Sequence, residues 1–184
     1  MTKFNGPNIR RRDIDDLIEE WNQTPRRFVF VVDDNFFGVG PKHAEHTKEV
    51  LRQIIKRGKK RLWFSQTTIN MGEDAEGLKL AYQAGCRGML IGFESFNPES
   101  LKDFHKGINR KNISRYKELV DGFHRAGIPV FGAFIIGADQ DTEETVADTA
   151  IQSVKLGIDT IQITNLTPLP GTKLYERWMA QKKI

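Results

Sequence analysis

Cysteine is nearly absent from this sequence, and so are long apolar runs. One cysteine, Cys86, among 184 residues excludes an internal disulfide framework and a metal site built from several of the chain's own thiolates. No stretch approaches the roughly 18–20 uninterrupted apolar residues that a membrane-spanning helix requires. The N-terminal residues MTKFNGPNIRRRD contain no apolar core of a secretory signal. We therefore expect a cytoplasmic protein without a membrane span.

A strong excess of either charge is missing as well. Lysine and arginine total 28 against 24 aspartate and glutamate residues, which gives a net charge of +4. Basic residues gather at Arg10–Arg12 and at Lys56–Arg61, but no recognisable nucleic-acid-binding module surrounds them. We therefore expect no nucleic-acid partner. Hydrophobic residues make up 39% of the chain and include 12 phenylalanines, which is enough for the core of one domain.

Five short apolar runs predict strands. Most of them carry β-branched or aromatic residues at odd and even positions alike, which is typical of parallel strands buried on both faces. The runs cover residues 28–32, 62–65, 89–93, 130–137 and 160–166.

Helical patterns lie between these runs. Apolar residues at helical spacing, or a capping residue before and a glycine after, predict helices around residues 14–21, 50–55, 75–84, 115–126 and 142–156. The alternation of strand and helix predicts an α/β fold with a parallel sheet, either barrel-like or doubly wound, with one longer insertion over 96–114. A dinucleotide-binding fold is rejected because the segment Gly38-Val39-Gly40-Pro41 lacks the third glycine of that motif.

Polar residues follow the predicted strands. In parallel βα architectures the chemistry lies at the carboxyl ends of the strands, so these residues are expected to meet at one mouth. Carboxylates and amides there can accept hydrogen bonds from an ammonium group or from ribose hydroxyls, which favours a ligand site. The residues are Asp33-Asp34-Asn35, Ser65-Gln66-Thr67-Thr68, Glu94-Ser95, Gly137-Ala138-Asp139, Asn165 and Thr167.

The histidines and the cysteine are less informative. His43 and His46 have the spacing of two metal ligands, but no third ligand is near in sequence, so we expect exposed helical residues rather than a zinc site. His105 and His124 are expected at the surface or in packing contacts. Cys86 lies before the third predicted strand, at the end opposite the mouth, and is expected to be a buried filler rather than a nucleophile.

Several segments resemble radical S-adenosylmethionine (radical SAM) enzymes, in the same order along the chain. They are VVDDNFFG, AGCRGMLIGFES, LKDFHKGIN, AFIIGADQDT and TPLPGTKLYE. The resemblance covers nearly the whole chain and is nearest to the branch that often carries an upstream cobalamin-binding domain. It implies a partial (β/α) TIM-like barrel of about five parallel strands, with the first strand of the six-unit barrel missing. Residues 1–184 would then be one incomplete core domain, with a leading helix and units two to six.

The resemblance also implies the residues that bind S-adenosylmethionine. Asp33, Asp34 and Asn35 match the segment that binds the methionine amino group, and Glu94 and Ser95 match the ribose-contacting position. Ile135, Gly137 and Asp141 match the adenine-contacting segment. Lys106 falls where relatives often place a cation that faces the cofactor carboxylate.

The chain departs from the family at its defining motif. The Cys-x-x-x-Cys-x-x-Cys loop that holds the 4Fe–4S cluster is absent, and the segment TKFNG, which follows that loop in relatives, begins at Thr2. We therefore expect a fragment of a radical SAM enzyme that retains part of the cofactor pocket and is inactive alone. The cluster, and a possible cobalamin, would belong to the full-length parent, whose substrate the resemblance does not identify.

Two alternatives stay open. The first is a cluster-free module that binds a nucleotide-like ligand or a partner without catalysis. The second is a metal-dependent hydrolase or aldolase barrel that uses Asp33, Asp34 and Glu94, although no lysine or histidine directly follows a strand. Independently of these, loss of the first strand would leave residues 28–32 as an apolar edge, for which we expect self-association or a covering partner.

Overall fold

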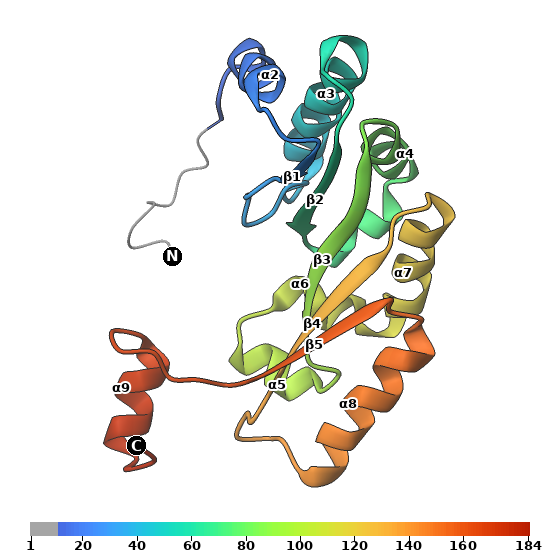
Figure 1. The fold of residues 1–184 in the computed structure, drawn as a ribbon. Helices are drawn as coiled ribbons and strands as arrows, with labels where there is room; N and C mark the ends of the chain where they lie inside the picture. Colours follow the sequence, from blue (N-terminus) through green and yellow to red (C-terminus); the bar gives the residue numbers. More distant parts are fainter. Residues whose placement is uncertain (1–10) are drawn as a thin grey trace.

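The computed structural model describes residues 11–184; Arg10 and the segment TKFNG lie outside the described residues. Five strands form one sheet in sequence order, and each neighbouring pair is parallel. The sheet curls into part of a barrel, as the partial (β/α) barrel prediction requires (Figure 1). The strands are β1 (Phe28–Phe30), β2 (Leu62–Thr67), β3 (Cys86–Glu94), β4 (Val130–Ile136) and β5 (Thr160–Asn165).

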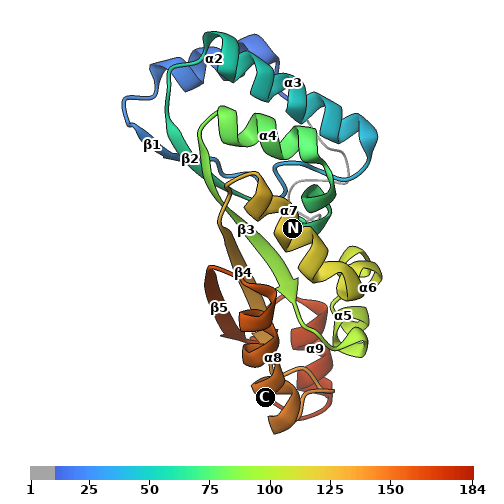
Figure 2. The same cartoon turned by 90° about the vertical axis from the view of Figure 1, so that its right-hand side faces the viewer.

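Helices before and between the strands pack along one face of this sheet (Figure 2). They are α2 (Ile14–Gln23), α3 (Pro41–Arg57), α4 (Ala75–Gln83), α7 (Tyr116–Arg125) and α8 (Glu143–Leu156). The predicted insertion contains the short helices α5 (Pro98–Asp103) and α6 (Gly107–Asn112) and a 3₁₀ turn, η2 (Ile113–Arg115). A further 3₁₀ segment, η1 (Ile69–Glu73), follows β2, and α9 (Lys173–Ala180) lies near the C-terminus. Within residues 11–184, no helix combines the length and hydropathy needed to cross a membrane.

Local sequence explains where the helices begin and end. Asp13 and Asp74 cap α2 and α4 by accepting hydrogen bonds from backbone amides of the first turn. Thr142 and Thr145 form a reciprocal capping box at the start of α8, where free amides need acceptors. Gly157 ends the same helix with φ at 76°, a conformation that glycine adopts without strain.

The core lies between the sheet and these helices. Large side chains on the helix-facing side of the strands are fully buried, among them Trp63, Met89, Ile91 and Phe134. Helix α7 covers the centre of this layer with Leu119, Val120 and Phe123.

The expectation that the strands are buried on both faces is wrong. Burial alternates along β2, where Trp63, Ser65 and Thr67 are buried and their neighbours are half-buried. Strand β5 is mostly exposed. Only the helix-facing side chains enter the core, because the concave face of the partial barrel is left half-open.

The amino-terminal end of the concave face carries a row of aromatic rings. Phe64 lies between Phe30 and Phe131, with ring centroids 5.5 and 4.9 Å away. Gly88 leaves the space for this row, since a Cβ there would lie 2.9 Å from the Phe64 ring and 3.1 Å from the Phe131 ring. This apolar floor lies at the end opposite the polar mouth.

A buried arginine fixes the connection from α2 to β1. Arg61, 7% exposed, donates to the backbone carbonyls of Trp21 (2.9 Å), Thr24 and Arg26. Part of the basic cluster at 56–61 is therefore structural. At the same end of the sheet, the Asp159 carboxylate accepts from the Val130 amide at 2.8 Å and contacts His124 at 2.9 Å.

Candidate functional site

A cavity of about 300 Å³ lies at the carboxyl ends of β2 and β3, the mouth of the partial barrel. It holds two carboxylates, one lysine, one histidine and several amide and hydroxyl groups. We call it the mouth cavity; its lining is Asp34, Gln66, Thr67, Thr68, Leu90, Gly92, Glu94, His105, Lys106, Ile108 and Asn109. Polar residues from the ends of β1, β2 and β3 line this cavity, as predicted, whereas the predicted polar residues after β4 and β5 do not line it.

Glu94 is the most constrained residue of the mouth cavity. Its backbone is left-handed, with φ at 69°, and it follows an irregularity in the pairing of β3 with β4. A non-glycine residue in this conformation is strained, and such strain is concentrated at functional sites. The carboxylate lies over Gly92, where a Cβ would stand 2.6 Å from Oε1. It forms an ion pair with Lys106, Nζ to Oε1 2.6 Å.

Asn109 holds the backbone that carries Glu94. Its side-chain amide donates to the carbonyl oxygens of Gly92, at 2.7 Å, and Phe93, at 3.2 Å. Asn109 is only 4% exposed, so these bonds are shielded from water. The hydroxyl of Tyr116 lies 3.4 Å from the Phe93 carbonyl oxygen. The shape of the mouth therefore depends on a buried side chain from α6.

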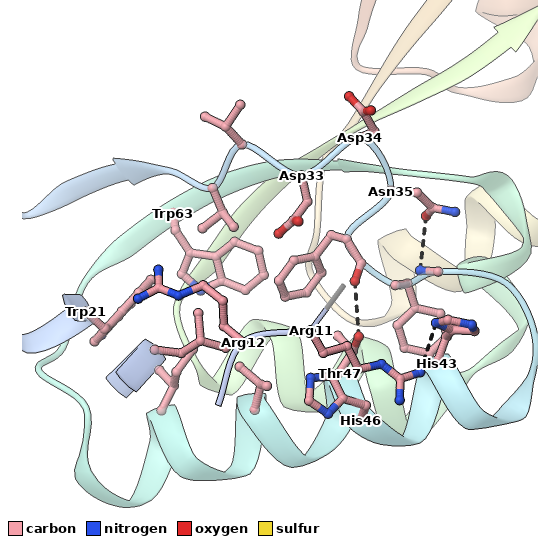
Figure 3. Close-up of a pocket in the computed structure, with 18 of the residues that line it drawn as sticks. Arg11, Arg12, Trp21, Asp33, Asp34, Asn35, His43, His46, Thr47 and Trp63 are labelled. Atoms are coloured by element: carbon pink, nitrogen blue, oxygen red, sulfur yellow. Dashed lines mark hydrogen bonds between the residues drawn. The ribbon is translucent and has the colours of Figure 1, made fainter. Parts of the chain in front are cut away.

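The side chains of the two aspartates after β1 point in different directions. Both residues line a second cavity of about 790 Å³ between α2, α3 and the segment after β1, into which Asp33 points, but only Asp34 also borders the mouth cavity (Figure 3). We call this the helix-side cavity. Burial raises the pKa of the Asp33 carboxyl, and the neighbouring charge of Asp34 raises it further. Of the two carboxylates predicted to bind one amino group, only Asp34 borders the mouth.

The side-chain oxygen of Asn35 is used within the protein. It accepts hydrogen bonds from the Gly38 amide and the Thr67 hydroxyl, both at 3.2 Å, and from the Thr68 amide at 3.3 Å. Asn35 thereby ties the segment after β1 to the end of β2, which sets the position of Asp34.

The helix-side cavity is mainly apolar, with basic residues on one rim. His43 and His46 line it and are half-buried, so the expectation that they are exposed helical residues is wrong. Arg11 contacts His43 Nδ1 at 3.0 Å, and burial, Arg11 and His43 lower the pKa of His46. Residues 11–184 contain no group of three or more histidine, cysteine, aspartate or glutamate side chains placed to hold a metal ion.

The remaining predicted residues are not among those that line the mouth cavity. Ser95 is buried and its hydroxyl accepts from the Asn97 amide at 3.0 Å. Ile135 lies on the concave face of β4, paired with Thr164. The Asp141 carboxylate accepts from the Gly137 amide at 2.8 Å and closes the turn after β4.

Three polar residues of the mouth were not predicted as individual ligand-binding residues. Gln66 was visible as part of a polar strand end, and alternation along β2 would have placed it on the open face. His105 has a left-handed backbone with φ at 56°, a conformation that the sequence does not predict. Asn109 lies in the insertion and acts through carbonyl groups 16 and 17 residues away.

Solved structures that share this fold include two cobalamin-containing S-adenosylmethionine enzymes. The methyltransferase TsrM from Kitasatospora setae, solved with cobalamin and a [4Fe-4S] cluster bound, matches 93% of this chain and 34% of its own, with a TM-score of 0.75 and 20% identity. The cobalamin-dependent enzyme OxsB, solved with aqua-cobalamin, matches 92% of this chain and 25% of its own, with a TM-score of 0.58 and 16% identity.

Sequence relatives include a methyltransferase and a methylase. Bacteriochlorophyllide d C-12(1)-methyltransferase of Chlorobaculum tepidum is 33% identical over 178 residues, 93% of this chain and 37% of that protein. Hopanoid C-2 methylase of Rhodopseudomonas palustris is 28% identical over 189 residues, 97% of this chain and 34% of that protein. The chain thus spans little more than a third of the length of these relatives.

A family model covers most of the chain. The model of the radical SAM superfamily matches residues 3–152, which include the strand ends that build the mouth cavity. The fold agrees with this match, and so do the sequence relatives. The chain therefore belongs to the radical SAM superfamily.

Proposed function

We propose that the mouth cavity binds S-adenosylmethionine, and that this chain supplies the cofactor-binding part of a methyltransferase. Membership of the superfamily implies S-adenosylmethionine and a 4Fe–4S cluster as cofactors. The observation that carries the proposal is the charge set of one cavity: two carboxylates, Asp34 and Glu94, and one cation, Lys106.

These charges complement the two ends of an amino acid. A carboxylate accepts hydrogen bonds from an ammonium group or from ribose hydroxyls, and a lysine attracts a carboxylate. Asp34 would hold the ammonium group, and Lys106 the carboxylate. The strained, buried Glu94 is suited to the ribose hydroxyls, because Asn109 and Gly92 fix its direction before any ligand arrives. The ligand would then share Lys106 with Glu94.

Methyl transfer is the reaction class that the relatives favour. The proteins from Chlorobaculum tepidum and Rhodopseudomonas palustris are a methyltransferase and a methylase, and TsrM is a methyltransferase. We infer a methyltransferase as the parent activity of this chain, with cobalamin as a cofactor of the complete assembly.

The residues of this chain do not fit a 4Fe–4S cluster. Such clusters are held by several cysteine thiolates, and the sequence has one cysteine. Cys86 begins β3, at the end of the sheet opposite the mouth, and is fully buried. Burial raises the pKa of its thiol to about 12, so the thiol stays protonated. We therefore propose that this chain alone binds S-adenosylmethionine without cleaving it.

Calorimetric titration of the 184-residue chain with S-adenosylmethionine tests the proposal. Glu94→Gln and Lys106→Met should each weaken binding at least about 10-fold, since each removes a charged hydrogen-bond partner. Glu118→Gln and Lys117→Met are the matched controls, because both alter exposed ion pairs on α7 and should leave the affinity unchanged. Absence of binding to the unaltered chain would contradict the proposal.

Iron and sulfide reconstitution under anaerobic conditions tests the statement about the cluster. The chain should take up no stoichiometric cluster absorbance, and S-adenosylmethionine should remain intact in the presence of a reductant. A stoichiometric cluster on this chain would overturn the argument from its cysteine content.

A further inference from the structure

Two rows of uncharged residues continue the mouth cavity along the concave face of the sheet. Residues paired side by side in parallel strands point to the same face, so the strand register defines these rows. One row joins Gln66, Leu90 and Phe131, and the next joins Gly92, Ala133 and Gln162. Gln66, Leu90 and Gly92 also line the mouth cavity, so the cavity and the concave face form one continuous surface.

The second row forms a recess between larger side chains, which we call the lumen recess. Gly92 has no side chain, and Ala133, paired with it on β4, has only a methyl group. Among the described residues, and apart from its chain neighbours, a Cβ added at Gly92 would have only the Glu94 carboxylate within 4 Å. Phe131 and Ile135 stand two residues before and after Ala133, on the same face of β4. The lumen recess therefore opens directly beneath the Glu94 carboxylate.

Two side-chain amides border the lumen recess from neighbouring strands. Gln66 lies on β2 and is half-buried, and Gln162 lies on β5 and is exposed. The Gln66 carbonyl of the backbone accepts from the Phe36 amide at 2.9 Å, but neither glutamine side chain has a hydrogen-bond partner among the described residues. A glutamine amide can both donate and accept, so it suits uncharged oxygen and nitrogen groups of a ligand.

Charge on this surface is confined to the mouth. Asp34, Glu94 and Lys106 lie there, and Glu94 Oε1, which stands over Gly92, is already paired with Lys106 at 2.6 Å. An anion in the lumen recess would meet the Glu94 carboxylate, and a cation would compete with Lys106 for it. Either ion would lose its water without gaining a free partner, whereas an apolar group gains by leaving water. The lumen recess is therefore suited to an uncharged ligand.

We propose that the lumen recess binds the methyl acceptor of the parent methyltransferase, and that the part bound there is uncharged and mainly apolar. Leu90 and Phe131 contact its apolar body, and Gln66 and Gln162 bind oxygen or nitrogen groups at its edges. This inference rests on the proposed function, because a cofactor held by Glu94 lies at the roof of the recess.

NMR titration of the ¹⁵N- and ¹³C-labelled 184-residue chain with two probes tests the charge selectivity. The probes are 2-acetylnaphthalene and 2-naphthoate, which share a ring system and differ in charge. We expect 2-acetylnaphthalene to shift the methyl signals of Leu90 and Ala133 and the side-chain amides of Gln66 and Gln162. 2-Naphthoate should bind there at least about 10-fold more weakly, because its carboxylate gains no counterion.

Two substitutions test the site itself. Ala133→Leu fills the lumen recess and should weaken binding of 2-acetylnaphthalene at least about 10-fold. Ala147→Leu, the same change at an exposed position of α8, is its matched control and should leave the affinity unchanged. Gln162→Glu removes a hydrogen-bond donor at an exposed position and should weaken the same probe about 5-fold. Its control is Gln83→Glu, on the exposed face of α4.

Binding of the cofactor is followed at other residues than binding of the probe. S-adenosylmethionine is followed at the amides of Glu94 and Lys106, and the probe at Ala133 and Gln162. If the probe binds and S-adenosylmethionine does not, the proposed function fails, while the lumen recess remains a site for uncharged ligands. If S-adenosylmethionine binds and the probe does not, only the inference about the acceptor fails.

Three results would overturn the proposal. One is a set of 2-acetylnaphthalene shifts confined to the helix-side cavity, for example at Thr47. The second is binding of 2-naphthoate at the lumen recess as tightly as the uncharged probe. The third is an unchanged affinity in Gln162→Glu together with an unchanged affinity in an Ala133→Leu variant that circular dichroism shows to be folded.

Discussion

The two ends of the sheet use charged and strained groups in opposite ways. At the amino-terminal end, the guanidinium of Arg61 is enclosed by backbone carbonyls, and the Asp159 carboxylate is shared by an amide and His124. At the carboxyl end, Glu94 keeps a strained backbone and pairs with a lysine that is 44% exposed. The first end satisfies its polar groups internally, whereas the second leaves them open toward a cavity.

This difference indicates that the amino-terminal end of the sheet contributes to stability, whereas the mouth contributes to ligand binding. Buried polar groups that are fully hydrogen-bonded hold a fold in one arrangement, and removing one partner leaves the others unsatisfied. Groups that line a cavity with incomplete partners remain available to a ligand. Substitutions at the amino-terminal end should therefore change the free energy of unfolding, and substitutions at the mouth should change affinity.

The largest effect is expected from Gly85→Ala. Gly85 has φ at 100°, and an added Cβ would run into the carbonyl oxygen of Arg61. Both the strained backbone and the clash oppose folding, so the loss should exceed about 4 kcal/mol and yield little folded protein. Gly171→Ala is the control, since it shares the positive φ but has nothing within 4 Å of the added Cβ. Equal melting temperatures for the two variants would show that the clash with the Arg61 carbonyl oxygen does not destabilise Gly85→Ala.

Arg61→Met should destabilise the chain by about 3 kcal/mol, because it leaves the carbonyls of Trp21, Thr24 and Arg26 without their donor. Urea unfolding followed by circular dichroism measures this change. Arg87→Met, an exposed arginine at the same end, should have an effect below about 1 kcal/mol. A comparable loss in both variants would show that the enclosed guanidinium has no special role.

Asn109→Leu tests whether Asn109 positions Glu94 at the carboxyl end of the sheet. Loss of the amide releases the Gly92 and Phe93 carbonyls, so Glu94 is no longer held in its direction. S-adenosylmethionine affinity should fall about 10-fold, while stability falls by about 1–2 kcal/mol. Asn112→Leu, which removes a bond to Ile108 within the same helix, should leave affinity unchanged. An affinity of Asn109→Leu equal to that of the unaltered chain would contradict the positioning role.

The smallest expected effect is the contribution of Asp159, at the amino-terminal end of the sheet, to the pH dependence of the free energy of unfolding. Burial acts to raise the pKa of Asp159, but the Val130 amide and His124 outweigh it, and the net pKa lies below the usual value. A carboxyl whose folded pKa is depressed stabilises the fold above its unfolded pKa of about 3.9, and that stability is lost as pH falls further. As pH is lowered from about 6 to 3, the urea midpoint of Asp159→Asn should therefore fall less steeply than that of the unaltered chain. An unchanged slope would exclude this contribution.

Much of the architecture followed from local sequence. The apolar runs placed all five strands, although the run at 28–32 is a shorter strand, Phe28–Phe30, and the one at 62–65 extends to Thr67. Capping residues placed the start of α8 at the predicted position. These features depend on neighbours within a few residues, which is why they can be predicted from one sequence.

Features that depend on distant residues could not be predicted. The sequence places Arg61 in a basic cluster, but only the fold brings it among carbonyls 35 to 40 residues away. Asp33 and Asp34 are adjacent in the chain, yet their side chains point in different directions, and only Asp34 borders the mouth cavity. The resemblance assigned both to one ligand group, and side-chain direction was the missing information.

Chemical-shift mapping of the ¹⁵N-labelled chain with S-adenosylmethionine tests the central claim most directly. We expect shifts at the amides of Gly92, Glu94 and Lys106, and none at Gly85 or Val130 at the amino-terminal end. We also expect no shift at Thr47, which lines the helix-side cavity. Shifts confined to Thr47 or to the amino-terminal end, or no shifts at saturating cofactor, would contradict the assignment of the mouth as the binding site.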